Sequence, residues 1–193
     1  MKKQLSLFDS SGSYYAPRSE KLILNKPSLI QWKERIFHYQ QQVQVIAAPQ
    51  QQTLFELSQT TWHSPEEINP FSLPLHSSLF WRQAASSALL ETHEQGCLYF
   101  IIDSTLPLLL YVGETKLTAN QRWKGTHDCK SYILQYIELH RRYDLGVKVS
   151  SAFWQLIPSK KVLQQWEREL ILKWRSPFNK ECWQWWGQPF GKD

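Results

Sequence analysis

The feature that most constrains the fold is a pair of β-rich runs joined by a short turn. Cys97 to Ile102 and Leu108 to Val112 consist almost entirely of aliphatic and aromatic residues, and Ser104 to Pro107 lies between them. Two such runs with so short a link predict an antiparallel hairpin. Gly113 follows directly and permits a tight turn or a close approach of the backbone to a ligand.

The pattern after the hairpin alternates helix and strand. Apolar periodicity predicts a helix over Asp128 to Tyr143, a strand over Gly146 to Ile157, and a final helix from Ser159 to about Arg175, which Pro177 ends. We therefore expect an α+β fold with a small three-stranded, mostly antiparallel sheet flanked by helices. The 193 residues are too few for two large domains.

Four parts follow one another along the chain. Residues 1–26 contain a Ser/Gly patch and Pro17, are followed directly by Pro27, and are expected to form a flexible tail. Residues 27–93 form a mainly helical and irregular extension, which begins with a helix at Ser28, where a capping-box sequence precedes an apolar stripe. Residues 94–180 hold the hairpin and the elements after it. Residues 181–193 are a Trp-rich C-terminal tail, and we favour a lid on the core over stacking on unpaired bases.

Charge and cysteine content exclude several classes of protein. The chain has 22 Lys+Arg against 17 Asp+Glu, a net charge of +5, which suits a polyanionic partner. Its three cysteines are widely spaced and include no Cys-x-x-Cys pair, which argues against a zinc ribbon or a disulfide framework and fits a reducing cytoplasm. No apolar stretch resembles a signal peptide or a membrane span, so we expect no membrane partner.

Two tyrosines of the hairpin are candidate functional residues. If the turn centres on Thr105, then Tyr99 and Tyr111 lie directly opposite each other on one face of the sheet. The alternative is a pair of half-buried strand tyrosines without a chemical role.

Glu167 is unusual because it falls inside the apolar face of the last predicted helix. At about 100° per residue, it shares that face with five apolar residues, Leu163, Trp166, Leu170, Ile171 and Trp174. A carboxylate in such a place is costly unless it is paired or binds a metal. Two interpretations stay open: a buried salt bridge, for instance to Arg122, or a ligand of a divalent metal.

Taken together, these residues resemble the GIY-YIG nuclease superfamily over about residues 96–180. The matching positions in chain order are Cys97-Leu98-Tyr99, Tyr111-Val112-Gly113, Arg122, Glu167 and Pro177-Phe178-Asn179. One position departs from the family pattern, because Cys97 stands where the family has glycine and Gly96 is displaced by one residue.

The resemblance implies hydrolysis of phosphodiester bonds in DNA with one Mg²⁺ or Mn²⁺ held by Glu167. In this arrangement, Tyr99 takes the proton from the attacking water, and Tyr111 orients the water and the phosphate. Arg122 stabilises the charge on the phosphate. Asn179 ties the chain end to the site by hydrogen bonds.

The N-terminal tail carries a second resemblance. Gln4-Leu5-Ser6-Leu7-Phe8 is similar to the short peptide by which bacterial replication and repair proteins bind the sliding clamp. In such a complex, Leu7 and Phe8 would fill an apolar pocket while Gln4 hydrogen-bonds at its rim. The alternative is a terminal strand or a plug on the protein's own core. Residues 51–55 are a looser match, which we interpret as structural.

These features favour a metal-dependent DNA endonuclease of repair, recombination or restriction, located in the cytoplasm with the nucleoid. His127 is an alternative base in place of a tyrosine, although an exposed loop histidine is the simpler expectation. The competing functions are a non-catalytic DNA-binding module and a clamp-binding adaptor, both keeping the nuclease fold.

Overall fold

The structure, a computed structural model, describes residues 24–45, 64–77, 96–115, 128–155, 157 and 159–190. Its centre is an antiparallel sheet with the strand order β1-β4-β2-β3. The strands are β1 His76–Ser77, β2 Cys97–Asp103, β3 Leu108–Thr115 and β4 Val149–Trp154. The three predicted strands are confirmed, and the two-residue β1 from the N-terminal region is an addition at the edge beside β4. Within this sheet, β3 forms the other edge.

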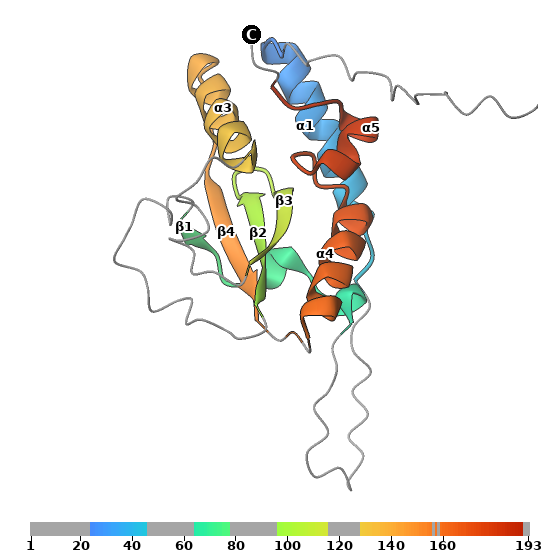
Figure 1. Cartoon of the computed structure of the whole chain (residues 1–193). Helices are drawn as coiled ribbons and strands as arrows, with labels where there is room; N and C mark the ends of the chain where they lie inside the picture. Colours follow the sequence, from blue (N-terminus) through green and yellow to red (C-terminus); the bar gives the residue numbers. More distant parts are fainter. Residues whose placement is uncertain are drawn as a thin grey trace, which may run out of the picture.

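Helices cover the sheet mainly beside β3. They are α1 Lys26–Gln41, α3 Asp128–Arg142, α4 Lys160–Trp174 and the short α5 Trp183–Trp186, with 3-10 turns η1 Pro65–Glu67, η2 Pro70–Ser72 and η5 Lys180–Cys182. Figure 1 shows α1, α4 and α5 together on the β3 side of the sheet. The predicted α+β class is therefore confirmed. In the part of the chain described, no helix is both long and apolar enough to cross a membrane.

Helix α1 begins earlier than the sequence predicts. Asn25 is its N-cap, because the Asn25 side chain accepts a hydrogen bond from the Ser28 backbone N–H at 2.9 Å. The prediction that Ser28 itself opens the helix is wrong. Pro27 lies in the first turn, where a missing N–H breaks no intrahelical bond, so the proline starts this helix instead of interrupting it.

The N-terminal helix shares the core of the sheet domain. Leu29, Trp32 and Ile36 are buried along one side of α1, as the predicted apolar stripe requires. The Trp32 indole N–H donates to the Trp186 carbonyl at 3.0 Å, and the Tyr39 hydroxyl donates to the Lys173 carbonyl at 3.0 Å. These contacts join α1 to the C-terminal elements as well as to the sheet.

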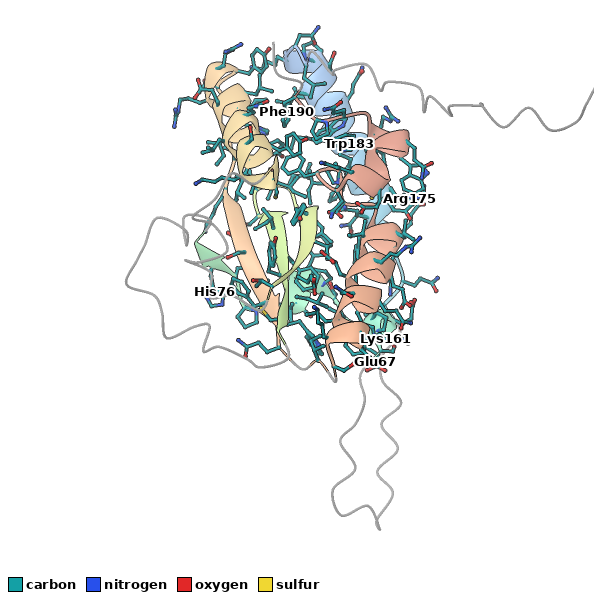
Figure 2. The ribbon with its side chains drawn as sticks, in the orientation of Figure 1. Glu67, His76, Lys161, Arg175, Trp183 and Phe190 are labelled. Atoms are coloured by element: carbon teal, nitrogen blue, oxygen red, sulfur yellow. The ribbon has the colours of Figure 1, made fainter. Side chains whose placement is uncertain are left out.

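The tryptophans that follow the domain fold back onto it. Trp186 is buried, and its indole N–H donates to the Arg175 carbonyl at 2.6 Å. The Arg175 guanidinium carbon lies 4.4 Å from the ring centroids of both Tyr39 and Trp185. Figure 2 labels Arg175 at the end of α4. The described tryptophans of this segment thus form the lid favoured above.

A buried polar cluster joins α1, β2 and α3. The Lys33 ammonium lies 3.1 Å from Asp103 Oδ2 and 2.9 Å from His140 Nε2, and the Tyr136 hydroxyl donates to Asp103 Oδ2 at 2.7 Å. His140 Nδ1 lies 2.7 Å from the Tyr136 carbonyl oxygen. An ammonium can only donate and a carbonyl can only accept, so this geometry requires a neutral His140 protonated on Nδ1.

This cluster predicts a loss of stability in mild acid. Burial lowers the pKa of His140 below its ordinary value of 6.5, and Lys33 lowers it further, against the Tyr136 carbonyl and Asp103. As the pH falls below 6.5, the unfolded chain therefore binds a proton at His140 that the folded chain does not, and the free energy of unfolding falls by up to about 1.4 kcal/mol per pH unit from this residue. Urea unfolding at several pH values between 5 and 8 measures that slope.

Two glutamine variants, one at His140 and a control at His38, show whether His140 causes this pH dependence. His140→Gln should flatten the slope below pH 6.5, whereas His38→Gln, at an exposed site on α1, should leave it as in the wild type. Equal slopes in the wild type and His140→Gln would contradict the neutral assignment.

Candidate active site

A β-bulge sets the register of the hairpin. Asp103 pairs with Leu108 and Ile102 with Leu109, but Ile101 pairs with Tyr111, so Leu110 is an extra residue in β3. Tyr99 consequently lies opposite Gly113. The prediction that Tyr99 faces Tyr111 directly is wrong, because it assumed a turn centred on Thr105, whereas Asp103 pairs with Leu108 and the bulge then adds one more residue to β3.

The bulge nevertheless brings the two phenols together. Side chains alternate between the faces of a strand, so a one-residue change of register reverses every one of them. Had the register next to the turn continued without the extra residue, Tyr111 would lie on the face opposite Tyr99. With the bulge, the two rings share a face as diagonal neighbours, with ring centroids 5.8 Å apart at an interplanar angle of 33°.

Gly113 makes room for these rings. A Cβ atom at this position would lie 2.7 Å from Cε1 of Tyr111 and even closer to the hydroxyl end of Tyr99. Because Tyr99 is almost completely buried, its ring has little room to retreat. The absence of a side chain at Gly113 is thus a condition for the observed packing of both tyrosines.

Asn179 and Glu167 bind the same short stretch of β3 from its open edge. Asn179 Oδ1 accepts the Val112 N–H at 3.0 Å and its Nδ2 donates to the Val112 carbonyl at 2.9 Å. Glu167 Oε1 accepts the N–H of Glu114 at 3.0 Å. The structure therefore gathers Tyr99, Tyr111, Glu167 and Asn179 around residues 111–114.

Sequence reasoning missed two residues at this edge. Ser176 is fully buried, and its hydroxyl donates to Asn179 Oδ1 at 2.6 Å, which fixes the orientation of that amide. Gln40 binds the backbone of Leu109 from α1. Gln40 follows Ile36 by four residues, so it lies on the apolar face of the predicted helix. A polar residue on an apolar face also singled out Glu167, and the same criterion could have found Gln40.

Two expected site residues, Arg122 and His127, and the N-terminal peptide of residues 4–8 lie outside the described residues. The choice between a salt bridge from Glu167 to Arg122 and a metal ligand therefore stays open. Among the residues that the structure describes, no group of three or more His, Cys, Asp or Glu side chains could hold a metal ion. Glu167 and the nearby tyrosines offer oxygen donors, which fit a hard cation such as Mg²⁺ that keeps most of its waters.

The surroundings of Tyr111 shift the pKa of its phenol from the ordinary value. Burial raises the pKa of Tyr111 above its ordinary value of 10, and the neighbouring Tyr99, Cys129 and Glu167 raise it further. Tyr111 is therefore a neutral phenol at physiological pH, able to donate a hydrogen bond to an anion.

The departure at Cys97 does not add a reactive group. Burial raises the pKa of the Cys97 thiol to about 11, so the thiol stays protonated and a poor nucleophile. Gly96 has a φ of 87°, a conformation that favours glycine. Gly96, although displaced by one position, thus allows the positive φ of the backbone immediately before β2.

Comparison with known families agrees with this geometry. Residues 95–181 match the family model described as the GIY-YIG catalytic domain, which supports the superfamily resemblance and indicates a nuclease domain. The match spans less than half of the chain and excludes α1. Neither the curated proteins nor the solved structures that were searched contain a match to this chain.

The packing around Gly113 predicts that an added methyl group lowers stability there more than at Gly146. Gly113→Ala should lower the free energy of unfolding by about 1–3 kcal/mol, since the new Cβ forces the Tyr99 and Tyr111 rings apart. Gly146→Ala is the control, because its Cβ would only touch Thr105 Cγ2 at 3.4 Å, and it should change stability by about 0.5 kcal/mol or less. Urea unfolding measures both, and equal effects would refute the close approach at Gly113.

Proposed function

We propose that this chain is a metal-dependent DNA endonuclease that hydrolyses phosphodiester bonds. The observation that carries the proposal is the convergence of two phenols, a carboxylate and an amide on residues 111–114, inside the segment that matches the GIY-YIG catalytic domain. A basic chain with a net charge of +5 suits a nucleic-acid substrate.

The proposed division of labour follows from what each group can do. A divalent cation held by Glu167 would stabilise the charge that develops on the leaving oxygen. Tyr99 takes the proton of the attacking water, and Arg122 stabilises the phosphate. Tyr111 acts as a hydrogen-bond donor that orients water and phosphate, since its raised pKa opposes loss of its own proton.

Asn179 has a supporting role in this proposal. Its amide pairs with both backbone groups of Val112, the residue between Tyr111 and Gly113. The Ser176 hydroxyl holds the amide in that orientation. Asn179 thereby keeps β3 in the position that the chemistry requires and need not touch the substrate.

The first test replaces the carboxylate without removing its hydrogen bond. Glu167→Gln keeps an oxygen for the Glu114 N–H, so the variant should fold as the wild type does, but it lacks the charge that holds a cation. Its Mg²⁺-dependent cleavage of DNA should fall by roughly 100-fold or more. Cleavage gels and thermal unfolding measure the two effects.

Glu169→Gln is the matched control, because Glu169 is exposed on the same helix. It carries the same loss of charge and should cleave at the wild-type rate. Undiminished cleavage by Glu167→Gln would contradict the metal-binding role. A wild-type chain that binds DNA without cutting it would favour the DNA-binding alternative.

We further propose that the peptide of residues 4–8 recruits the enzyme to the bacterial sliding clamp during repair, recombination or restriction. Leu7→Ala combined with Phe8→Ala should weaken binding to purified clamp at least about tenfold, because a few apolar anchors supply most of the affinity of such peptides. Cleavage of naked DNA should stay unchanged. Calorimetry measures the binding.

The looser match at residues 51–55 provides the control. Leu54→Ala with Phe55→Ala removes the same side chains from that second segment and should leave clamp affinity as it was. If the wild type and the variant at Leu7 and Phe8 bind the clamp with equal affinity, residues 4–8 are not the clamp-binding peptide.

A further inference from the structure

Two arginines meet at the junction of α1, α4 and α5, where these three helices lie together (Figure 1). The Arg175 guanidinium carbon lies 4.4 Å from the ring centroids of Tyr39 and Trp185, so this cation is packed against two aromatic rings. The Arg35 guanidinium carbon lies 5.8 Å from the Trp186 ring centroid, and its Nη2 donates to the Trp185 carbonyl at 3.4 Å. Both arginines thus pack against the aromatic residues of α5.

These contacts leave most hydrogen-bond donors of the two guanidinium groups unused. Ring stacking involves the face of a guanidinium, whereas its five N–H bonds point outward in its plane. In the part of the chain that the structure describes, no carboxylate pairs with Arg35 or Arg175, and no group accepts a hydrogen bond from the Arg175 guanidinium. Arg35 is exposed and Arg175 is half-buried, so these donors face water. The junction therefore presents two positive charges to solvent.

The Arg175 side chain is held at both of its ends. Its backbone has a φ of 46° at the C-cap of α4, a left-handed conformation that glycine adopts most readily. The Arg175 carbonyl accepts the Trp186 indole N–H at 2.6 Å, which fixes this turn. The rings of Tyr39 and Trp185 restrain the guanidinium. Because the side chain is already ordered, it loses little conformational entropy when it binds an anion.

The distance of Arg175 from the candidate active site suits a long polyanion. Arg175 follows Glu167 by eight residues, which corresponds to about 12 Å along a helix axis. One strand of B-DNA carries a phosphate for every ~3.4 Å of the duplex axis. A duplex that lies at Glu167 and runs along α4 would therefore bring a phosphate about three to four nucleotides away to Arg175.

We propose that Arg175 and Arg35 bind backbone phosphates of duplex DNA, so that the junction of α1, α4 and α5 is a DNA-binding surface beside the candidate active site. The identity of the polyanion rests on the proposed nuclease function. Arg35 and Trp185 lie outside the segment that matches the GIY-YIG catalytic domain. This chain thus adds the surface to that domain.

The competing interpretation is that Arg175 only fastens α1 to α5 through the two rings. In that case its replacement lowers stability and leaves the affinity of the folded chain for DNA as it is. The test therefore measures binding itself, by fluorescence anisotropy of a labelled DNA duplex in excess chelator, where no metal-dependent cleavage occurs. Repeating the titration between about 0.05 and 0.2 M salt gives the slope of log affinity against log salt, which reports the number of phosphate contacts.

Arg35→Gln combined with Arg175→Gln is the test variant. It should bind the duplex about tenfold more weakly or worse at ~0.1 M salt, and the salt slope should become shallower by about 1.8, because each lost phosphate contact removes about 0.9. Arg141→Gln combined with Arg142→Gln is the matched control. It removes the same charge from exposed positions on α3 and should keep the wild-type slope.

If the double variant does not fold, Arg35→Gln alone decides, because Arg35 is exposed and its replacement should leave thermal unfolding unchanged. Its slope should be shallower by about 0.9 than that of Arg142→Gln, and equal slopes would overturn the proposal.

Three further results would overturn this surface: a folded double variant with wild-type affinity and slope, an equal loss in the α3 control, or a wild-type chain that does not bind the duplex. The first two leave the nuclease proposal standing, because that proposal depends on cleavage by the wild type. If the wild type binds DNA through Arg35 and Arg175 but cuts no substrate, the surface stands and the nuclease function fails.

Discussion

The open edge of β3 is the constraint on which the rest of the structure depends. An edge strand exposes unpaired N–H and C=O groups, and burying them beneath helices is possible only if each finds a partner. Here side chains replace a further strand: Gln40 binds Leu109, Asn179 binds Val112 and Glu167 binds the N–H of Glu114. Gln40 comes from the N-terminal helix α1, and Glu167 and Asn179 from the C-terminal part of the chain, so the edge is completed only in the folded chain.

This way of closing the sheet explains why α1 belongs to the domain. Besides Gln40, the helix contributes buried apolar residues, the Trp32 bond to Trp186, and the Lys33 contacts with Asp103 and His140. The lid formed by α5 rests on both α1 and the end of α4 (Figure 1). The folded unit is therefore larger than the segment that the family match spans.

The elements that sequence reasoning predicted correctly are those with a clear period. The hairpin, α3 and α4 lie close to their predicted bounds, whereas β4 is only the middle half of the strand predicted over Gly146 to Ile157. The apolar neighbours of Glu167 are buried, as its helical face requires. The bulge could not be predicted, because Leu108 to Val112 are all aliphatic or aromatic and no alternation of polar and apolar residues marks which face a residue takes. Strand β1 has two residues and is too short to form any pattern.

The candidate site also has features that the sequence predicted and features that only the structure shows. Glu167 stood out because a carboxylate in an apolar pattern is costly and needs a reason. Tyr99 and Tyr111 stood out because the expected hairpin placed them on one face of the sheet. Their common attachment to one edge did not follow from the sequence, since the partners of Gln40 and Asn179 are 69 and 67 residues away along the chain. Only the three-dimensional register shows that a single extra residue puts both phenols on one face.

Cleavage by the purified wild-type chain is the most direct test of the nuclease assignment. The measurement incubates linear, nicked, branched and flapped DNA with the protein in Mg²⁺, in Mn²⁺ and in excess chelator. Our account predicts strand breaks in at least one of these substrates with either metal and none in chelator. A folded chain that cuts none of them, or that cuts equally well in chelator, would contradict it.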